Sequence, residues 1–136
     1  MNLAGSRSDA ALSTLVILQL TMLAALFTQT PPHPPLAVAP FALGPFLGTA
    51  ISMAVAAIVL GATRTGLGTA VSVLAAVLAL VSYGPQKWID PAIGQIWPAV
   101  LLGEIAAASL LVDAVMTRRV QARADGCGHG PDGPTL

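Results

Sequence analysis

The chain has 136 residues and a mass of 13.7 kDa, and only 9% of its residues are Asp, Glu, Lys or Arg, against roughly 25% in soluble globular proteins. So small a charged fraction excludes an ordinary water-facing surface and indicates an integral membrane protein. A formal net charge of zero excludes the basic surface that a nucleic-acid partner requires, and a single cysteine excludes an intramolecular disulfide and a cysteine-based zinc site.

Four apolar stretches are long enough to cross a bilayer as helices, for which about 20 residues suffice. They cover residues 10–28, 41–62, 67–83 and 97–116. Because backbone amide and carbonyl groups find no water in the hydrocarbon region, such stretches form helices there. The sequence therefore predicts an all-α integral membrane fold, a four-transmembrane-helix bundle over residues 10–119 that follows a short segment of residues 1–9.

The first stretch, residues 10–28, is apolar on every side except for Gln19 and a few small hydroxyl groups. With Arg7 before it and small residues at positions 37–39 after it, the start of the chain resembles a signal peptide. Pro40 disfavours cleavage at that point, so we expect the first helix to be retained. A proline-rich loop is predicted between this helix and the second.

The other three stretches carry small residues at every fourth position, a spacing that lets helix backbones approach closely within a membrane. The stripes consist of Gly44, Gly48, Ser52 and Ala56, of Gly68, Ser72 and Ala76, and of Ala99, Gly103 and Ala107. Each stripe lies on one face of its helix. We expect them to pack the helices against one another, with the alternatives that one stripe faces another protein or that the spacing arises by chance in an alanine-rich chain.

The segment between the third and fourth stretches is rich in residues that form turns. It contains three aromatic side chains with polar groups, Tyr83, Trp88 and Trp97. Such rings prefer the membrane–water interface, so we predict that these three anchor the segment there. Asp90 followed by Pro91 is typical of the start of a helix and predicts a short interfacial helix. We predict a kink or break at Pro98 before the fourth helix.

The distribution of basic residues predicts that both termini are cytoplasmic. In that orientation five basic residues, Arg7, Arg64, Arg118, Arg119 and Arg123, lie inside and only Lys87 lies outside, as the positive-inside rule requires. The richness in Ala, Gly, Pro and Arg is typical of a GC-rich bacterial genome and favours the bacterial cytoplasmic (inner) membrane. Residues 120–136 are predicted to form a disordered cytoplasmic tail.

Glu104 is the most informative polar side chain, because it lies seven residues after Trp97 and hence about 10 Å below the membrane surface. An ionisable group at this depth needs a partner or a water-filled cavity. The candidate partner is Gln19, near the middle of the first span. The two either form a hydrogen bond between helices or contribute to a site for a proton, an ion or a ligand.

Asp113 lies on the same predicted helix, nine residues after Glu104, and therefore points to the opposite face. The two carboxylates cannot form an acid–base pair or a metal motif on one helix face. We expect Asp113 to be an interfacial charge close to Arg118 or Arg119.

These features favour a non-enzymatic accessory subunit, assembly factor or scaffold of a larger membrane complex, in contact with lipid and with other membrane proteins or a second copy of itself. The alternative is a small oligomeric transporter or channel in which Glu104 and Gln19 line a polar path. No nucleophile with a base and no metal-ligand motif can be assembled from the sequence, so neither an enzymatic activity nor a cofactor is expected.

Overall fold

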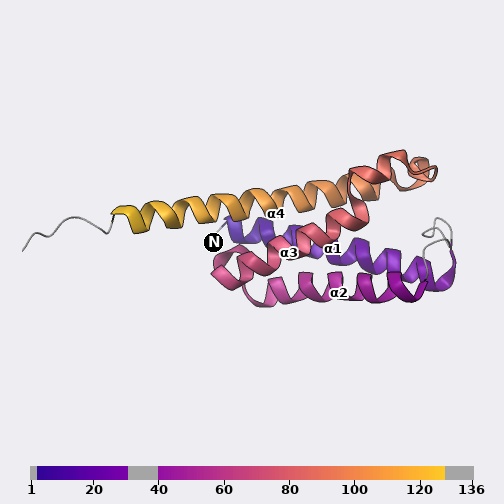
Figure 1. Cartoon of the computed structure of the whole chain (residues 1–136), viewed down its shortest axis with the longest axis horizontal. Helices are drawn as coiled ribbons and strands as arrows, with labels where there is room; N and C mark the ends of the chain where they lie inside the picture. Colours follow the sequence, from indigo (N-terminus) through magenta and orange to yellow (C-terminus); the bar gives the residue numbers. More distant parts are fainter. Residues whose placement is uncertain (1–2, 31–39, 128–136) are drawn as a thin grey trace, which may run out of the picture.

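The computed structural model describes residues 3–30 and 40–127. Within them the chain forms α1 (Leu3–Thr28), α2 (Pro40–Val59), the 3-10 helix η1 (Ala62–Arg64), α3 (Gly66–Tyr83), the 3-10 helix η2 (Pro85–Ile89) and α4 (Ile93–Cys127). The four α-helices form an up-and-down bundle in which α1 packs on α2, α2 on α3 and α3 on α4, and α4 returns to α1 (Figure 1). The predicted all-α four-helix bundle is confirmed. The predicted proline-rich loop lies almost wholly outside the described residues.

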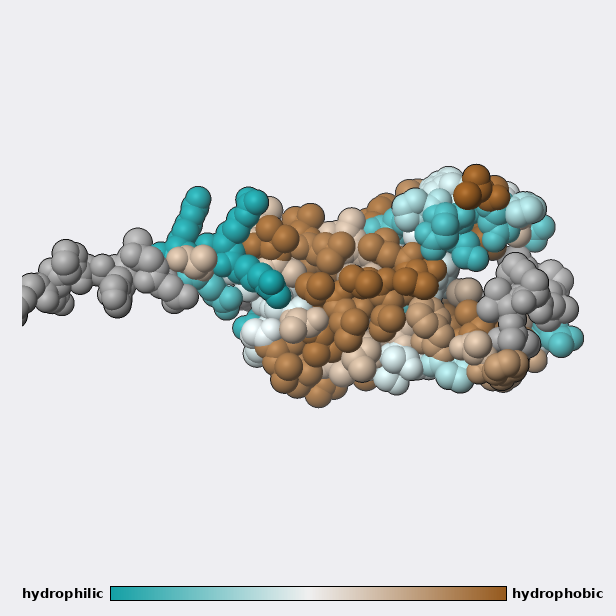
Figure 2. Space-filling view, viewed as in Figure 1, coloured by the Kyte–Doolittle hydropathy of each residue, from teal (hydrophilic) through white to brown (hydrophobic). Residues whose placement is uncertain are grey.

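Each of these four helices is long and apolar enough to span a membrane. The candidate spans are Gly5–Thr28, Phe41–Val59, Gly66–Ile89, which includes η2, and Ile93–Ala124. Figure 2 shows apolar side chains over the middle of the bundle, with polar side chains toward its two ends and on the protruding end of α4. This distribution indicates an integral membrane protein whose apolar helix faces contact lipid.

The interior of the bundle is built mainly from alanine and leucine. Its buried members include Leu12 and Leu15 on α1, Ala54 and Ala57 on α2, Ala75, Ala76 and Ala79 on α3, and Ala106, Ala107 and Leu110 on α4. Alanine on facing helices lets their backbones come close, and in lipid this close packing replaces the hydrophobic effect as the force that holds helices together.

The first and last helices, α1 and α4, extend further than the apolar stretches that predicted them. α1 begins at Leu3, so most of the predicted N-terminal segment is helical, and α4 continues to Cys127. Residues 120–127 therefore belong to a helix and not to the predicted disordered tail, whose remaining residues, 128–136, lie outside the described part. Hydropathy detects the part of a helix that lies in the membrane, so it misses turns that continue beyond it with exposed charges such as Arg119 and Arg123.

The fourth helix is not broken at Pro98. α4 begins at Ile93 and passes through Pro98 without interruption. The missing amide of Pro98 would have bonded to the carbonyl of Gly94, and this loss costs little near a helix start, where Gly94 is exposed. A helix does start after Asp90 and Pro91, at Ile93, but it is the beginning of α4 and not a separate short helix. The 3-10 helix η2 precedes Asp90, and the Asp90 side chain accepts a hydrogen bond from the backbone N–H of Ala92 at 2.9 Å.

Candidate functional site

A buried polar cluster joins α1, η1 and α4 at the end of the bundle where α1 begins. The hydroxyl of Ser8 donates a hydrogen bond to Oδ2 of Asp113 at 3.0 Å and lies 2.9 Å from Oγ1 of Thr63. All three side chains are buried. Asp113 is therefore an interior hydrogen-bond acceptor, and its side chain pairs with Ser8 and not with the predicted neighbours Arg118 or Arg119. Beside the cluster, Nη2 of Arg64 lies 3.1 Å from Oδ2 of Asp9.

The turn that supplies Thr63 depends on two glycines. Gly61 has a φ of +89°, in the left-handed region that glycine adopts most readily. Thr65 then caps α3, because its Oγ1 accepts a hydrogen bond from the backbone N–H of Gly68 at 2.9 Å. A Cβ on Gly68 would collide with the carbonyl oxygen of Ala62. Gly68 therefore belongs to the tight packing of α3 against η1.

Tyr83, a predicted interface anchor, is the last residue of α3, and its side chain packs inside the bundle. Its side chain is only 8% exposed, and its hydroxyl donates a hydrogen bond to the backbone carbonyl of Leu18 on α1 at 2.6 Å. On the other side the ring packs on Gly103 of α4, where a Cβ would lie 2.8 Å from Cβ of Tyr83. Tyr83 thus connects α1 and α4 through α3, and Gly103 provides the space for it.

The two tryptophans are about half exposed, and Trp88 contacts Glu104. The indole Nε1–H of Trp88 donates a hydrogen bond to Oε1 of Glu104 at 3.1 Å. η2 packs against α4 and brings Trp88, which precedes Glu104 by 16 positions, to the carboxyl group. The predicted pairing of Glu104 with Gln19 is therefore replaced by a pairing with Trp88. Trp97 is exposed on α4, and no hydrogen bond of its indole is found within the described residues.

Glu104 lies near the middle of the bundle along its length. It is eleven residues after Ile93, where α4 begins, and nine residues before Asp113, in the polar cluster at the other end. At 1.5 Å per residue these separations are about 16 Å and about 13 Å. Together they are close to the roughly 30 Å thickness of a hydrocarbon core.

Gln19 and Ser72 are buried polar side chains without a hydrogen-bond partner in the described part of the chain. The atoms concerned are Oε1 of Gln19 and Oγ of Ser72, and Gln19 is only 1% exposed. Such groups are rare in protein interiors, and ordered water commonly satisfies them. They mark the two points at which the interior of the bundle has unused hydrogen-bonding capacity.

The three small-residue stripes face in different directions. The stripes of α3 and α4 face inward, since Gly68, Ser72, Ala76, Gly103 and Ala107 are all buried. On α2 the inward face is formed by other residues, among them Leu47 and Ala50, and the stripe turns outward. A Cβ on Gly48 would meet no atom within 4 Å, and Ser52 is exposed. Gly44 is the exception on α2, because a Cβ there would lie 3.7 Å from Cζ of Phe27 on α1.

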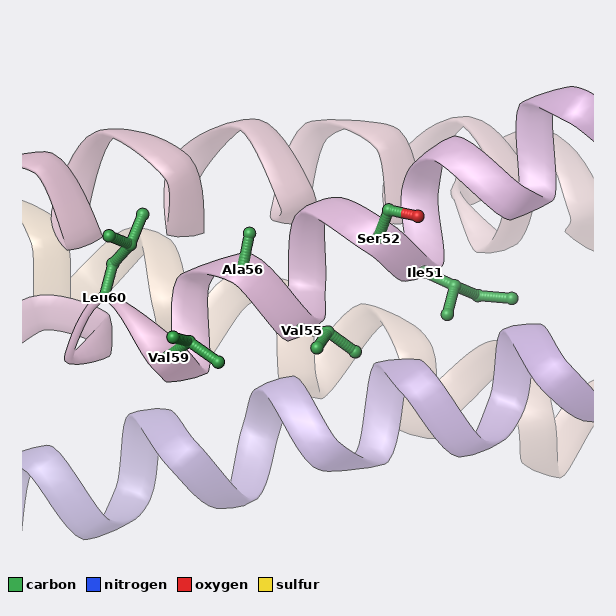
Figure 3. A pocket seen from close by; sticks show the side chains of 6 residues that line it. All are labelled: Ile51, Ser52, Val55, Ala56, Val59 and Leu60. Atoms are coloured by element: carbon green, nitrogen blue, oxygen red, sulfur yellow. The ribbon is translucent and has the colours of Figure 1, made fainter.

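A shallow groove of about 520 Å³ runs along the outward side of α2 (Figure 3). It is lined by Ile51, Ser52, Val55, Ala56 and Val59 of α2 and by Leu60, which directly follows α2. In the view of Figure 3, Ser52, Ala56 and Leu60 project from one side of the helix and Ile51 and Val55 from the other. The groove continues the small-residue stripe and is apolar except for the hydroxyl of Ser52.

The fold and these contacts define the class of the protein as an all-α membrane bundle with several candidate spans. Comparison with protein-family models, with curated proteins and with solved structures finds no match to this chain. Within residues 3–30 and 40–127, no three His, Cys, Asp or Glu residues come together as ligands for a metal ion. The argument for a function therefore depends on the contacts and surfaces described above.

Proposed function

We propose that the protein is a non-enzymatic accessory subunit, assembly factor or scaffold that binds another membrane protein through the outward face of α2. The observation that carries this proposal is the open space at Gly48. Two of the three stripes are used for packing inside the bundle, whereas the third presents Gly48, Ser52 and Ala56 to the outside. Close contact between membrane helices requires such small residues, whereas contact with lipid does not.

The surroundings of this face support the same proposal. Many exposed positions elsewhere on the bundle carry large aliphatic or aromatic side chains, such as Ile17, Phe27 and Leu67. The groove on α2 is bordered by Val55 and Val59, which project from the same side of α2 and would lie along one side of an approaching helix (Figure 3). A second membrane-spanning helix fits such a groove by placing its own side chains beside the glycine.

The proposal places both termini in the cytoplasm and the bundle in a bacterial inner membrane. The contact of Ser8 with Asp113 brings the start of α1 and the polar part of α4 to one end of the bundle, where Arg7, Arg64, Arg118, Arg119 and Arg123 also lie. Lys87 lies in η2, near the opposite end. The single cysteine, Cys127, allows a direct test, because a membrane-impermeant maleimide should label it in inverted vesicles and not in right-side-out vesicles.

The partner-binding proposal is tested by extracting the protein from its own membrane in mild detergent and recording native mass spectra. The expected result is an unlike chain bound in a fixed ratio to the wild type and lost from Gly48→Leu. The matched control is Gly94→Leu, because a Cβ on Gly94 also meets no atom within 4 Å. A wild type that is recovered only as a monomer or homo-oligomer would contradict the proposal, and so would a Gly48→Leu variant that retains its partner.

The second candidate is a small transporter or channel, supported by the unpartnered buried atoms of Gln19 and Ser72. Polar groups of this kind are found along the water-filled paths of membrane transporters. This candidate predicts proton or ion flux into liposomes that contain the purified protein, with less flux for Gln19→Leu and Glu104→Gln. Liposomes with the wild type that are no leakier than protein-free liposomes would exclude it.

A further inference from the structure

We propose that Glu104 and Trp88 form a recognition site for a membrane-spanning helix that carries Arg or Lys at mid-membrane. This surface lies on α4, and α4 and α2 occupy diagonal positions in the bundle without contacting each other. The site is therefore separate from the groove on α2. It gives the proposed scaffold a second binding face, and the negative charge of Glu104 requires a basic side chain on the partner helix.

The first argument is that no Lys or Arg side chain forms an ion pair with Glu104 within residues 3–30 and 40–127. All six Lys and Arg residues belong to the described part, and the ion pairs there join Arg64 to Asp9 and Lys87 to Asp90. The hydrogen bond from Trp88 engages Oε1 of Glu104. A carboxylate at the depth of Glu104 is costly unless a cation or a proton accompanies it. A basic side chain of a partner would supply this charge.

The second argument is the direction from which that charge can arrive. Glu104 is partly exposed on the lateral surface of the bundle, and its neighbours Leu101, Ile105 and Ala108 are exposed as well. Together the four residues occupy positions i, i+3, i+4 and i+7 of α4, which form one continuous face of a helix. Three of them are apolar. This face is suited to a second helix that lies alongside α4 in the membrane and supplies one positive charge opposite Glu104.

The third argument is that Trp88 holds the carboxyl group in place. Its N–H engages one oxygen of Glu104, and its indole ring is 47% exposed beside that carboxyl group. The face of an indole ring attracts a guanidinium or ammonium group that lies over it. Trp88 thus fixes the orientation of the carboxyl group and adds a second attraction for a cationic side chain.

A bare metal ion fits this site less well than a basic side chain. A dehydrated cation needs several oxygen ligands, and Glu104 is surrounded on its exposed side by the apolar residues Leu101 and Ile105. An Arg or Lys side chain carries its charge on an apolar stem, which would lie on those residues.

The test uses the full-length protein in zwitterionic phosphatidylcholine vesicles, with Trp97→Phe so that Trp88 is the only tryptophan. The probes are two synthetic Leu/Ala membrane-spanning peptides with a dansyl acceptor, one with a central Arg and one with a central Leu. Energy transfer from Trp88 measures binding. We expect the Arg peptide to bind about tenfold more tightly, the size of a polar contact between membrane helices. Glu104→Gln should remove this difference, and Asp90→Asn should leave it unchanged.

Equal binding of the two peptides would overturn the proposal, and so would a preference for Arg that survives Glu104→Gln. The Gln variant keeps an oxygen that can accept the hydrogen bond of Trp88, so the fold should be retained, and unchanged circular dichroism and gel filtration check this. Because the test of the α2 face uses Gly48→Leu and native partners, failure of one proposal is distinguishable from failure of the other.

A second measurement separates a basic partner from a bound proton. Dicyclohexylcarbodiimide modifies protonated carboxyl groups in apolar surroundings, and mass spectrometry locates the modified residue. We expect saturating Arg peptide to protect Glu104 at least fivefold, while the Leu peptide gives no protection. Labelling of Glu104 that neither peptide changes would overturn the proposal and identify Glu104 as a proton-binding group alone.

Discussion

The hydroxyl of Ser8 donates a hydrogen bond to the carboxylate of Asp113 across 105 positions of sequence. The contact joins α1 to α4, the first helix of the bundle to the last, and Thr63 of the α2–α3 turn lies against it. Three segments that are distant in sequence are thereby held at one end of the bundle. In lipid, where apolar side chains give little drive for association, such hydrogen bonds contribute to the choice of neighbouring helices.

Loss of the Asp113 carboxylate is expected to destabilise the bundle. In Asp113→Leu, the hydroxyl of Ser8 loses a buried acceptor, which should lower the free energy of unfolding by about 2 kcal/mol. Asp113→Asn keeps an acceptor oxygen and should cost less than about 1 kcal/mol. Unfolding of the purified protein in mixed micelles with increasing dodecyl sulfate measures both values.

The control for this comparison is Ser109→Ala, on the same helix. The hydroxyl of Ser109 bonds to the carbonyl of Ile105 in its own helix, so its removal should change stability by less than about 0.5 kcal/mol. A Leu variant of Asp113 that is as stable as the wild type would show that the cluster does not hold the helix ends together.

Gly103 and Gly48 should respond in opposite ways to a single added methyl group. In Gly103→Ala the new Cβ would lie 2.8 Å from Cβ of Tyr83, and the helices must separate at a cost of about 1–3 kcal/mol. In Gly48→Ala the methyl group enters open space, and the better helix propensity of alanine should be neutral or stabilise by up to about 1 kcal/mol. The same micelle titration compares the two variants, and equal effects would contradict the assignment of inward and outward stripes.

The sequence was sufficient to predict four helices long and apolar enough to span a membrane, because the absence of charge over long stretches has one physical solution in lipid. It was not sufficient to predict which way each helix faces. The stripe of α2, with Gly48, has the same spacing as the stripe of α4, with Gly103, but only Gly103 faces inward. Small residues favour close contact without specifying whether the contact is inside the bundle or with a partner.

The hydrogen-bond partners of the polar residues were also hard to predict, because the sequence does not specify how each helix is rotated about its axis. Glu104 was expected to pair with Gln19, near the middle of the first span, but η2 places Trp88 beside the Glu104 carboxyl group instead. The cluster of Ser8, Thr63 and Asp113 left one signal in the sequence, namely that a four-span topology places all three near the same end. Depth alone does not give the rotation of a helix about its axis, and the contact depends on that rotation.

Gln19 should tolerate replacement by an apolar side chain of similar size. Its Oε1 is buried and finds no partner in the described part of the chain, so Gln19→Met removes an unsatisfied polar atom while keeping the volume. We expect the free energy of unfolding to be unchanged or to rise by up to about 1 kcal/mol. A loss of more than about 1 kcal/mol would mean that this amide is satisfied in the membrane, by water or by a ligand.

Acidification should weaken the connection between α3 and α4 through Asp90. The backbone N–H of Ala92 lowers the pKa of the Asp90 carboxyl below its ordinary value of 3.8, and Lys87, with Nζ 3.5 Å from Oδ2, acts in the same direction against the effect of desolvation. Because the pKa is lower in the folded state, the stabilisation from Asp90 is fully present above pH 3.8 and is lost as the pH falls through the lowered value.

Asp90→Asn keeps an oxygen that can accept the bond from Ala92 but does not titrate. The difference in the free energy of unfolding between wild type and Asp90→Asn, measured in a non-ionic detergent, should therefore be constant from about pH 7 to about pH 5 and should shrink below about pH 4. A difference that stays constant down to about pH 2.5, or that grows on acidification, would show that the charge of Asp90 does not stabilise this turn.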